Sequence, residues 1–247
     1  MKQVRVEQIG SFEDFIEIIE EYNKNAFYRG HSNGAKWKLI PSIGRLILKN
    51  SSLQVGNYGG WKGFEKDILF RFKRYALQYL ANYKNLSQID WLVLGQHYGL
   101  PTRLLDWTEN PLVALFFAIE EDYKCESHIW IIIPSFLESL DKDIEDINEI
   151  TMYFPKILDA RMVSQKSCFT IHPLDNTSNP ILAIEDYNDD VGICELIKVV
   201  VPNNPKLKSK ILLRLNHLGV DYNSLFPDLS GLCRQIQFEF ENKIDRY

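Results

Sequence analysis

Residues 94–121, LGQHYGLPTRLLDWTENPLVALFFAIEE, give the clearest indication of how this chain folds and where it acts. Asn110 suits the N-cap of a helix and Pro111 suits its first position, while residues 112–119 offer no polar face. A helix that is apolar on every side is a buried helix. Polar side chains just before it are costly to desolvate unless they are paired or used, and the free amides of its N-terminus attract anions. The stretch therefore predicts a site beside a core helix.

The composition is that of an ordinary globular protein. The chain has 247 residues, of which 45% are hydrophobic and 25% charged, and it is long enough to bury a core. The net charge of −5 argues against a protein built mainly to coat nucleic acid, although it leaves a local basic groove open. No apolar run reaches the roughly 18 residues of a membrane helix, and the first residues lack the apolar core of a signal peptide. We therefore expect a cytoplasmic protein with no membrane partner.

Sequence motifs for common enzymes and metal sites are absent. The cysteines at 125, 168, 194 and 233 form no CxxC pair, and no histidine stands at ligand spacing, so we expect no metal. The chain has no Walker loop, GxGxxG, HExxH or GxSxG motif. Ordinary kinases, dehydrogenases, zinc proteases and esterases therefore lose most of their support.

Hydrophobic periodicity predicts a mixture of helices and strands. Residues 12–23, with Ser11 as the N-cap, are the first predicted helix. The other predicted helices cover residues 61–83, 89–98, 111–119, 205–218 and 225–242. The predicted strands cover residues 26–30, 128–134, 168–172 and 193–201. Residues 49–60 suit a flexible loop, and the acidic residues 141–149 suit a solvated surface segment.

These elements predict one α+β domain over residues 1–247. No repeat, low-complexity tract or linker divides the chain. We expect a largely helical portion over about residues 1–125, followed by a sheet-rich portion over residues 126–202. Helices complete the chain over residues 203–247. The expected core is a small mixed or antiparallel sheet.

Two arginines stand where a guanidinium needs a partner. Arg29 lies in an otherwise apolar strand, and Arg103 follows the tight turn formed by residues 99–102. Each could form a structural salt bridge, which for Arg29 could be with Asp106, and an Arg-Asp-Arg network could simply tie the core together. Each could equally clamp a phosphate or carboxylate, which a planar guanidinium fits well.

The polar patch before the core helix supplies further candidates. Asp106 could accept hydrogen bonds from sugar hydroxyls, Trp107 could stack on a ring, and Thr108 could orient a ligand. Trp107 is at least as well explained as a core residue. His31 could act as an acid or base, but a solitary histidine is more often structural.

Two sequence blocks carry a resemblance to a known family. The first is FYRGHS at residues 27–32, followed by Trp37, Pro41 and Arg45. The second is QHYGLPTRLLDWT at residues 96–108, continued by Pro111, Ala114, Phe117 and Ala118. Later matches are Arg161, Gln165, Phe169, Thr170 and LFPDL at residues 225–229. With these blocks in this order, nearly the whole chain resembles the FRG domain family, named for its N-terminal (F/Y)RG motif.

A weaker resemblance concerns activity. A strand arginine, a polar patch and then a P-x-x-A-x-x-F-A helix are similar to the arginine-serine-glutamate class of ADP-ribosyltransferases. The resemblance implies an ADP-ribosyltransferase-like fold, with NAD as substrate and its phosphates on Arg29. Tyr28, Gly30 and His31 would complete the NAD-binding strand. The Ser-Thr-Ser strand of that class would fall on residues 105–108, where Thr108 is the nearest hydroxyl match.

The chain departs from that class at the catalytic glutamate. The class carries it near the segment that corresponds to residues 159–169, and no Glu-x-Glu occurs there. Gln165, Asp159 or Asp228 would have to substitute, and we expect Asp106 to stabilise the positive charge of the reacting ribose. Arg103 and Arg161 complete the predicted catalytic residues. The acceptor would be a protein, a nucleic acid or water, as in a bacterial toxin or phage-defence protein that a partner chain could restrain.

Two other functions stay open. The same arginines could serve a non-catalytic module that binds a nucleotide or phosphorylated ligand. A nucleic-acid-binding or -processing protein is the third hypothesis, because the helix predicted over residues 61–83 is the most basic surface of the chain. Its basic residues are Lys62, Lys66, Arg71, Lys73, Arg74 and, just beyond it, Lys84. Glu65 and Asp67 interrupt this charge, and no cluster of metal-binding carboxylates supports phosphodiester hydrolysis.

Overall fold

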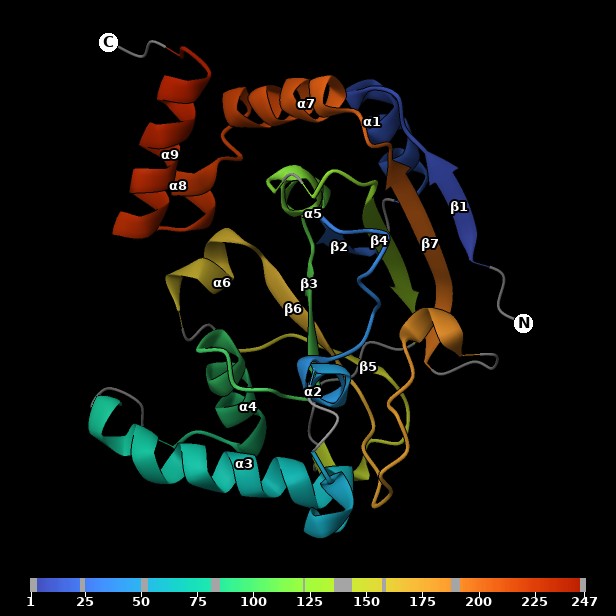
Figure 1. The fold of residues 1–247 in the computed structure, drawn as a ribbon, viewed down its shortest axis with the longest axis vertical. Coiled ribbons are helices and arrows are strands. Elements are labelled where there is room, and N and C mark those ends of the chain that lie inside the picture. Colours follow the sequence, from blue (N-terminus) through green and yellow to red (C-terminus); the bar gives the residue numbers. More distant parts are fainter. Residues whose placement is uncertain are drawn as a thin grey trace.

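A mixed sheet of seven strands lies at the centre of the described part of the chain (Figure 1). The computed structural model describes residues 4–22, 25–49, 53–80, 85–121, 123–135, 144–156, 159–187 and 192–244. The strands are β1 (Arg5–Gln8), β2 (Phe27–His31), β3 (Leu104–Thr108), β4 (Ser127–Pro134), β5 (Thr151–Tyr153), β6 (Ser167–Ile171) and β7 (Ile193–Val201). Their order is β1-β7-β4-β2-β3-β6-β5, with β1 parallel to β7 and the other neighbours antiparallel.

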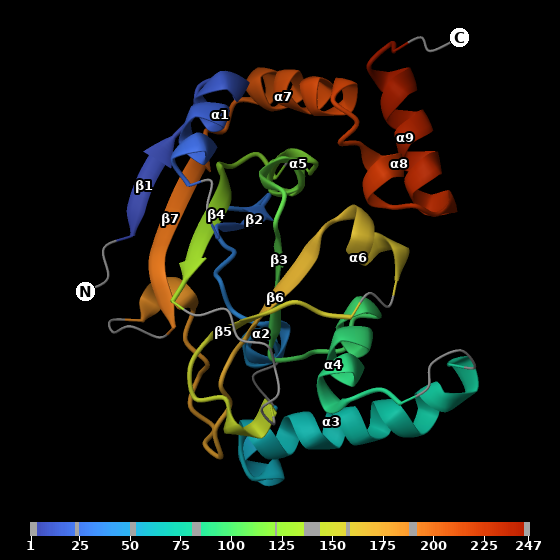
Figure 2. The same ribbon diagram turned by 180° about the vertical axis from the view of Figure 1, so that it is seen from behind.

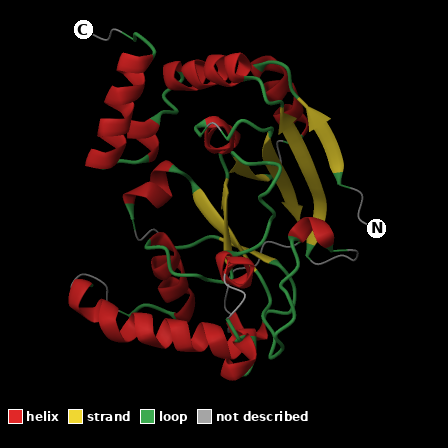
Figure 3. Ribbon diagram, in the orientation of Figure 1, coloured by secondary structure: helices red, strands yellow, loops and turns green. Residues whose placement is uncertain are grey.

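Most of the helices lie around this sheet at the periphery of the molecule, and the helices over residues 42–49 and 111–119 lie near the middle of the view (Figures 1 and 3). The α-helices are α1 (Phe12–Glu21), α2 (Ser42–Lys49), α3 (Trp61–Ala76), α4 (Gln88–His97), α5 (Pro111–Ile119), α6 (Ala160–Ser164), α7 (Pro205–His217), α8 (Tyr222–Leu225) and α9 (Leu229–Glu241). Short 3₁₀ helices cover Val55–Tyr58, Leu77–Tyr79, Ile144–Asp146 and Ile184–Asp186.

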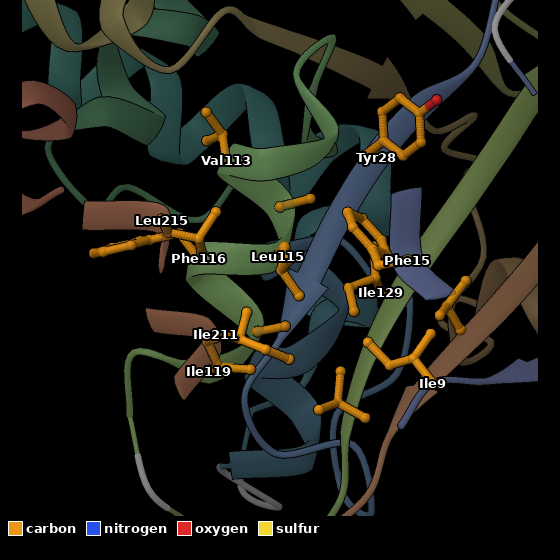
Figure 4. Close-up of a cluster of buried hydrophobic side chains, with 14 of the residues drawn as sticks. Ile9, Phe15, Tyr28, Val113, Leu115, Phe116, Ile119, Ile129, Ile211 and Leu215 are labelled. Carbon is orange, nitrogen blue, oxygen red and sulfur yellow. The ribbon is translucent and has the colours of Figure 1, made fainter. Parts of the chain in front are cut away.

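One half of the sheet packs against α5, α7 and α1. The alternation of strand side chains directs Tyr28 of β2 and Ile129 and Ile131 of β4 to this face, where they meet the apolar side chains of α5 (Figure 4). Phe116 of α5 is 1% exposed, as expected for a helix without a polar face. The predicted core helix is therefore confirmed. Asn110 is its N-cap and accepts a hydrogen bond from the Leu112 amide at 3.0 Å.

The other half of the same face packs against α3 and α4. Leu104 of β3 and Phe169 of β6 join Leu69 of α3 and Leu92 of α4 in a second apolar cluster. Figures 1 and 2 both show α1 and α7 at one end of the molecule and α3 and α4 at the other. The helical cover of this face therefore changes from α5 to α4 above β3.

The opposite face of the sheet is covered mainly by irregular segments. Trp107 of β3, Trp130 of β4 and Cys168 of β6 point to this side. They pack with Leu39 and Ile184, which lie in loops or short 3₁₀ turns and are joined by a hydrogen bond from the Ile184 amide to the Leu39 carbonyl. This face is therefore closed by core packing.

Most of the predicted elements are present. The Ser11 cap, α1, α4, β2, β4, β6, β7 and α7 agree with the sequence prediction to within a few residues. The helix predicted over residues 61–83 is shorter, because α3 ends at Ala76, and residues 81–83 lie outside the described residues. The helix predicted over residues 225–242 begins later, because α9 starts at Leu229, after Phe226, Pro227 and Asp228. The short helix α8 before it was not predicted.

Three parts of the prediction need correction. The mixed α/β fold is as expected, but β1, β2 and β3 all lie within residues 1–125, so that portion contributes strands as well as helices. The sheet is larger than expected, because the hydrophobic patterns of β1, β3 and β5 are too short or too mixed to predict strands from periodicity. In the segment predicted to be solvated, residues 141–143 lie outside the described residues, while Ile144 and Ile147 are buried. No helix among the described residues has the length and apolar character to cross a membrane.

Candidate functional site

A cleft lies on the sheet face where the cover changes from α5 to α4. Its larger cavity, of about 340 Å³, is bordered by Arg29, Asp106, Phe117 and Glu120 among others. A second cavity of about 250 Å³ adjoins it and shares Asp106 and Phe117 with it, together with Gln165 and Ser167. The first cavity is within the size range of small-molecule sites in proteins, about 300–1,000 Å³, and the second lies just below it.

Strand register forms the floor of this cleft. Tyr28 of β2 pairs with Thr108 of β3, and Thr108 pairs with Ser167 of β6. Asp106 lies two residues before Thr108 and therefore projects from the same face of the sheet. Asp106 pairs with Phe169 of β6. Segments far apart in the sequence thus meet at one place.

Arg29 occupies the opening between β2 and β3. These two strands pair only at Tyr28 and Thr108, and beyond that pair they separate. The Arg29 guanidinium lies in this opening, where Nη1 donates to the Asp106 carbonyl oxygen at 2.7 Å and lies 3.5 Å from Asp106 Oδ2. Burial lowers the pKa of Arg29 below its usual value, the Asp106 carboxylate opposes this shift, and Arg45 of α2 adds to it. The positive charge of Arg29 is thus only partly compensated by the groups around it in the cleft.

His31 positions Arg29. The Nε of Arg29 donates to His31 Nε2 at 3.0 Å, so this imidazole nitrogen must carry no proton. Burial, and then the charge of Arg29, holds the pKa of His31 well below its usual value. His31 is 1% exposed and its Nδ1 has no partner among the described residues. His31, predicted to bind the cofactor, therefore acts through Arg29 and does not border the cavity.

Asp106 is anchored but accessible. Its Oδ1 accepts a hydrogen bond from Gln96 Nε2 of α4 at 2.9 Å, and its Oδ2 faces Arg29. The hydroxyl of Thr102 in turn donates to Gln96 Oε1, which fixes the amide. The side chain of Asp106 is nevertheless 57% exposed and borders both cavities. Asp106 is therefore the best-placed carboxylate for work on a bound ligand.

Gly30 allows α5 to approach β2. A Cβ atom at this position would lie 2.1 Å from the Ala114 carbonyl oxygen and 2.6 Å from the Ala118 amide nitrogen. No side chain fits in that space, so Gly30 lets the helix pack directly on the strand. The glycine predicted to bind the cofactor thus shapes the cavity wall.

The two residues after Asp106, Trp107 and Thr108, contact other parts of the protein and stabilise the fold. Although Trp107 borders the cavity, it is 3% exposed, packs in the core, and donates from its indole nitrogen to Thr170 Oγ1 at 3.0 Å. Thr108 donates its hydroxyl proton to the Gln165 carbonyl at 2.6 Å and accepts from the Asn110 amide. Trp107 therefore has no exposed ring face on which a ligand could stack. The Thr108 hydroxyl already donates its proton to the protein backbone and cannot donate it to a ligand.

Arg103, which was predicted to be catalytic, lies outside both cavities. Its Nη2 is 2.6 Å from Glu65 Oε2, its Nε donates to the same oxygen at 2.7 Å, and its Nη1 donates to the Ile144 carbonyl. The side chains of Arg103 and Glu65 are 3% and 4% exposed. The ion pair joins β3 to α3, so the structural alternative holds for Arg103.

Arg161 and Gln165 hold the C-terminal segment. Arg161 pairs with Asp228 and lies over the ring of Phe226, while Gln165 donates from Nε2 to the Leu225 carbonyl at 3.1 Å. Asp228 also caps α9. Both predicted residues border the cleft. The Arg161 guanidinium and the Nε2 group of Gln165 are engaged in joining α6 to the residues around Phe226.

The basic side chains of α3 also have partners. Lys66 pairs with Glu145, Arg71 pairs with Asp67, and Lys62 donates to the Glu145 carbonyl. Lys73 and Arg74 lie over the rings of Trp91 and Tyr75, and Lys84 lies outside the described residues. Two of the five described basic side chains are thus ion-paired, and the other three contact a carbonyl or an aromatic ring.

Three residues of the cleft were not predicted as site residues, although Trp37 and Gln96 belong to the blocks that carry the family resemblance. Glu120, directly after α5, borders the cavity, and burial together with Glu121 raises its pKa to about 7. Trp37 is the exposed aromatic of the site, at 40%, and packs edge-on against Tyr123. Gln96 holds Asp106. Only the position of Glu120 at the end of an apolar helix could have indicated its partial burial.

The comparisons with known proteins give one finding. The family model of the FRG domain matches residues 24–127, a range that includes β2, β3 and α5 and therefore Arg29, Asp106 and Glu120. No curated protein and no solved structure matches the chain.

Proposed function

We propose that this chain, which belongs to the FRG domain family through its residues 24–127, binds NAD in the cleft and transfers ADP-ribose to a macromolecule. The ligand would place its pyrophosphate on Arg29 and its nicotinamide-bearing ribose near Asp106. The acceptor would be a protein side chain or a nucleic-acid base, or water if the protein only consumes NAD. Such an activity would suit a toxin or an antiviral defence protein that a partner chain restrains.

The observation that supports this proposal is the convergence of three separate segments on one cavity. The resemblance to ADP-ribosyltransferases requires an arginine strand, a polar strand before a helix, and a late strand-turn to form one site. Strands β2, β3 and β6 are neighbours in the sheet. They bring Arg29 of β2, Asp106 of β3 and Gln165 of the turn before β6 to the border of the same cavity. Nothing in the linear sequence requires residues 29, 106 and 165 to meet.

The chemistry expected of this arrangement is charge stabilisation. Cleavage breaks the bond between C1′ of the ribose and the nicotinamide nitrogen, and the electron pair leaves with neutral nicotinamide. The ribose then carries oxocarbenium-like positive charge, which a nearby fixed carboxylate stabilises. Asp106 would supply that carboxylate, because Gln96 fixes it without neutralising it. The acceptor forms the new bond to C1′ and releases its proton to solvent or to a carboxylate of the site.

A second candidate function has its own support. Of the four residues expected to be catalytic, Arg103, Arg161 and Gln165 are engaged in holding the fold together. Asp106 is held by Gln96 and Arg29, but its side chain is 57% exposed at the cavity. A cleft with one arginine and one anchored carboxylate could bind a nucleotide without cleaving it. A non-catalytic nucleotide-binding module is therefore the alternative that the test must separate.

The test follows nicotinamide release and labelled ADP-ribose transfer in the full chain mixed with NAD and cell extract. We expect release by the natural sequence and a loss of at least tenfold in Asp106→Asn, which keeps the hydrogen bond from Gln96 but removes the charge. Arg29→Lys keeps the charge but loses the planar fork, so it should weaken NAD binding. Asp67→Asn, on the outer surface of α3, is the matched control and should retain the activity.

The outcomes separate the two candidates. Release that disappears in folded Asp106→Asn supports the transferase or hydrolase, and the labelled product identifies the acceptor class. NAD that raises the melting temperature without nicotinamide release supports the binding module instead. If NAD neither raises the melting temperature nor is cleaved, NAD is not the ligand of this cleft and the proposed function is wrong.

A further inference from the structure

Glu120 is a carboxyl group of the cavity that the proposed chemistry does not use. It directly follows α5, and its amide donates to the Phe116 carbonyl at 2.9 Å, so the last turn of the helix fixes its backbone. The side chain is half-buried and borders the same cavity as Arg29. Among the described residues, no cation lies within ion-pair distance of it. A half-buried carboxyl without a partner requires an explanation.

Several titratable groups face Glu120 from the elements around it. Glu121 is its neighbour, Tyr123 follows in the same loop, Tyr222 lies on α8, and Arg234 lies on α9. Burial and then Glu121 raise the pKa of Glu120 to about 7, and only Arg234 opposes the shift. At neutral pH, Glu120 therefore exchanges between its charged and neutral forms, as titratable groups of binding sites often do.

Glu120 and Arg29 lie at different places along the cavity. Ser32 follows Arg29 by three residues and lies just beyond the end of β2. The hydroxyl of Ser32 donates to the Phe117 carbonyl at 2.7 Å, and Glu120 lies one helical turn beyond Phe117. Arg29 is partnered by Asp106, and Glu120 lies beside Glu121 in another part of the same lining.

We propose that Glu120 is a ligand-binding carboxylate that accepts a hydrogen bond from a sugar hydroxyl of the ligand whose phosphate lies on Arg29. This inference rests on the proposed function and adds to it a specific contact. An ionised carboxylate is a pure acceptor, and its hydrogen bonds to hydroxyl groups are among the stronger ones in proteins. The cavity then fits a ligand with an anionic group at one position and hydroxyl donors at another, as in ADP-ribose.

The inference predicts that binding becomes stronger as pH rises. A ligand that prefers ionised Glu120 must first remove its proton when the pH is below about 7. The ionised fraction of such a group rises about tenfold between pH 6 and pH 8, so the affinity should rise by up to about tenfold over that range. Above pH 8 the affinity should become constant.

The experiment measures the dissociation constants of ADP-ribose and of NAD by calorimetry between pH 5.5 and 8.5. ADP-ribose has the sugar hydroxyls but no nicotinamide, so it cannot be cleaved at that bond during the measurement. We expect both ligands to bind more tightly at high pH in the natural sequence. Glu120→Gln, which has nearly the same shape, should bind at the weaker level of low pH and show no such rise.

Glu121→Gln provides the matched control. Glu121 also borders the cavity, and its charge helps to raise the pKa of Glu120. Its removal should keep the rise in affinity but move the midpoint to lower pH. A rise that disappears in Glu121→Gln and persists in Glu120→Gln would overturn the assignment in favour of Glu121.

The remaining outcomes distinguish this inference from the proposed function. An unchanged pH profile in Glu120→Gln overturns the role of Glu120 while leaving NAD as ligand. A rise for NAD but not for ADP-ribose overturns the hydroxyl contact, since the carboxylate would then face the nicotinamide cation. The expected profile for both ligands without nicotinamide release supports the role of Glu120 and overturns the catalytic function. If neither ligand binds at any pH, both proposals are wrong.

Discussion

Arg103 and Arg29 are two arginines paired with carboxylates, and they show how differently the same pair of groups can be used. Arg103 and Glu65 are almost fully buried, at 3% and 4% exposure, and are joined by three contacts of 3.2 Å or less. Arg29 is 16% exposed, its partner Asp106 is 57% exposed, and their charged atoms are 3.5 Å apart. The first pair ties β3 to α3, whereas the second leaves both charged groups at the edge of a cavity.

This difference separates stability from binding. A buried pair with good geometry is costly to break, because the remaining charge has no water and no partner. A pair at a cavity edge contributes little to stability and keeps hydrogen-bonding capacity for a ligand. We therefore expect Arg103 to determine whether the protein folds and Arg29 to determine what it binds.

The largest effect is expected for Arg103→Met. The change leaves the Glu65 carboxylate buried without a cation and removes the donor to the Ile144 carbonyl. The free energy of unfolding should fall by roughly 3–5 kcal/mol, measured by urea denaturation followed by circular dichroism. Such a loss is a large part of the stability of an ordinary domain.

The double variant Arg103→Met/Glu65→Met is the control for that experiment. It removes both charges together and should recover much of the lost stability, because no buried charge remains unpaired. If Arg103→Met alone unfolds at the same urea concentration as the natural sequence, the ion pair is not structural. Arg103 would then return as a candidate ligand-binding residue.

An intermediate effect is expected for Gly30→Ala, which tests the wall beside Arg29. The new Cβ would overlap the Ala114 carbonyl oxygen and the Ala118 amide nitrogen, so α5 must move away from β2. Overpacking of this kind costs about 1–3 kcal/mol, measured as a lower midpoint in urea. Gly10→Ala is the matched control, because its nearest heavy atom would be Asp14 Oδ2 at 3.5 Å. Equal stability of the two variants would show that α5 can move freely from β2.

The sequence predicted the parts of the fold that depend on local patterns. The caps at Ser11 and Asn110 and the apolar helix α5 are confirmed, since each depends on residues within a few positions of one another. The strands β1 and β5 were missed, because strands of four and three residues carry too few side chains for a clear alternation. Strand β3 was incompletely recognised, because its sequence LLDWT does not alternate between apolar and polar residues along its whole length.

The site was predicted only as far as local sequence allows. Arg29 and Asp106 were recognised because charged groups beside apolar segments require a partner or a use. The different fate of Arg103 depends on Glu65, which lies 38 residues earlier on α3, and no local pattern gives that distance. Glu120 was missed for the same reason, since its burial depends on how α8 and α9 pack near the end of α5.

The smallest effect on stability is expected for Arg29→Met, which should nevertheless abolish NAD binding. Burial already lowers the pKa of Arg29, which means that the folded protein holds this cation at some cost. Its removal should change the free energy of unfolding by no more than about 1 kcal/mol. The NAD-induced rise in melting temperature should nevertheless disappear, because charged hydrogen bonds to the phosphate are each worth about 1.5–3 kcal/mol. A loss of stability as large as that of Arg103→Met would show that the two pairs serve the fold alike, and the comparison between them would be wrong.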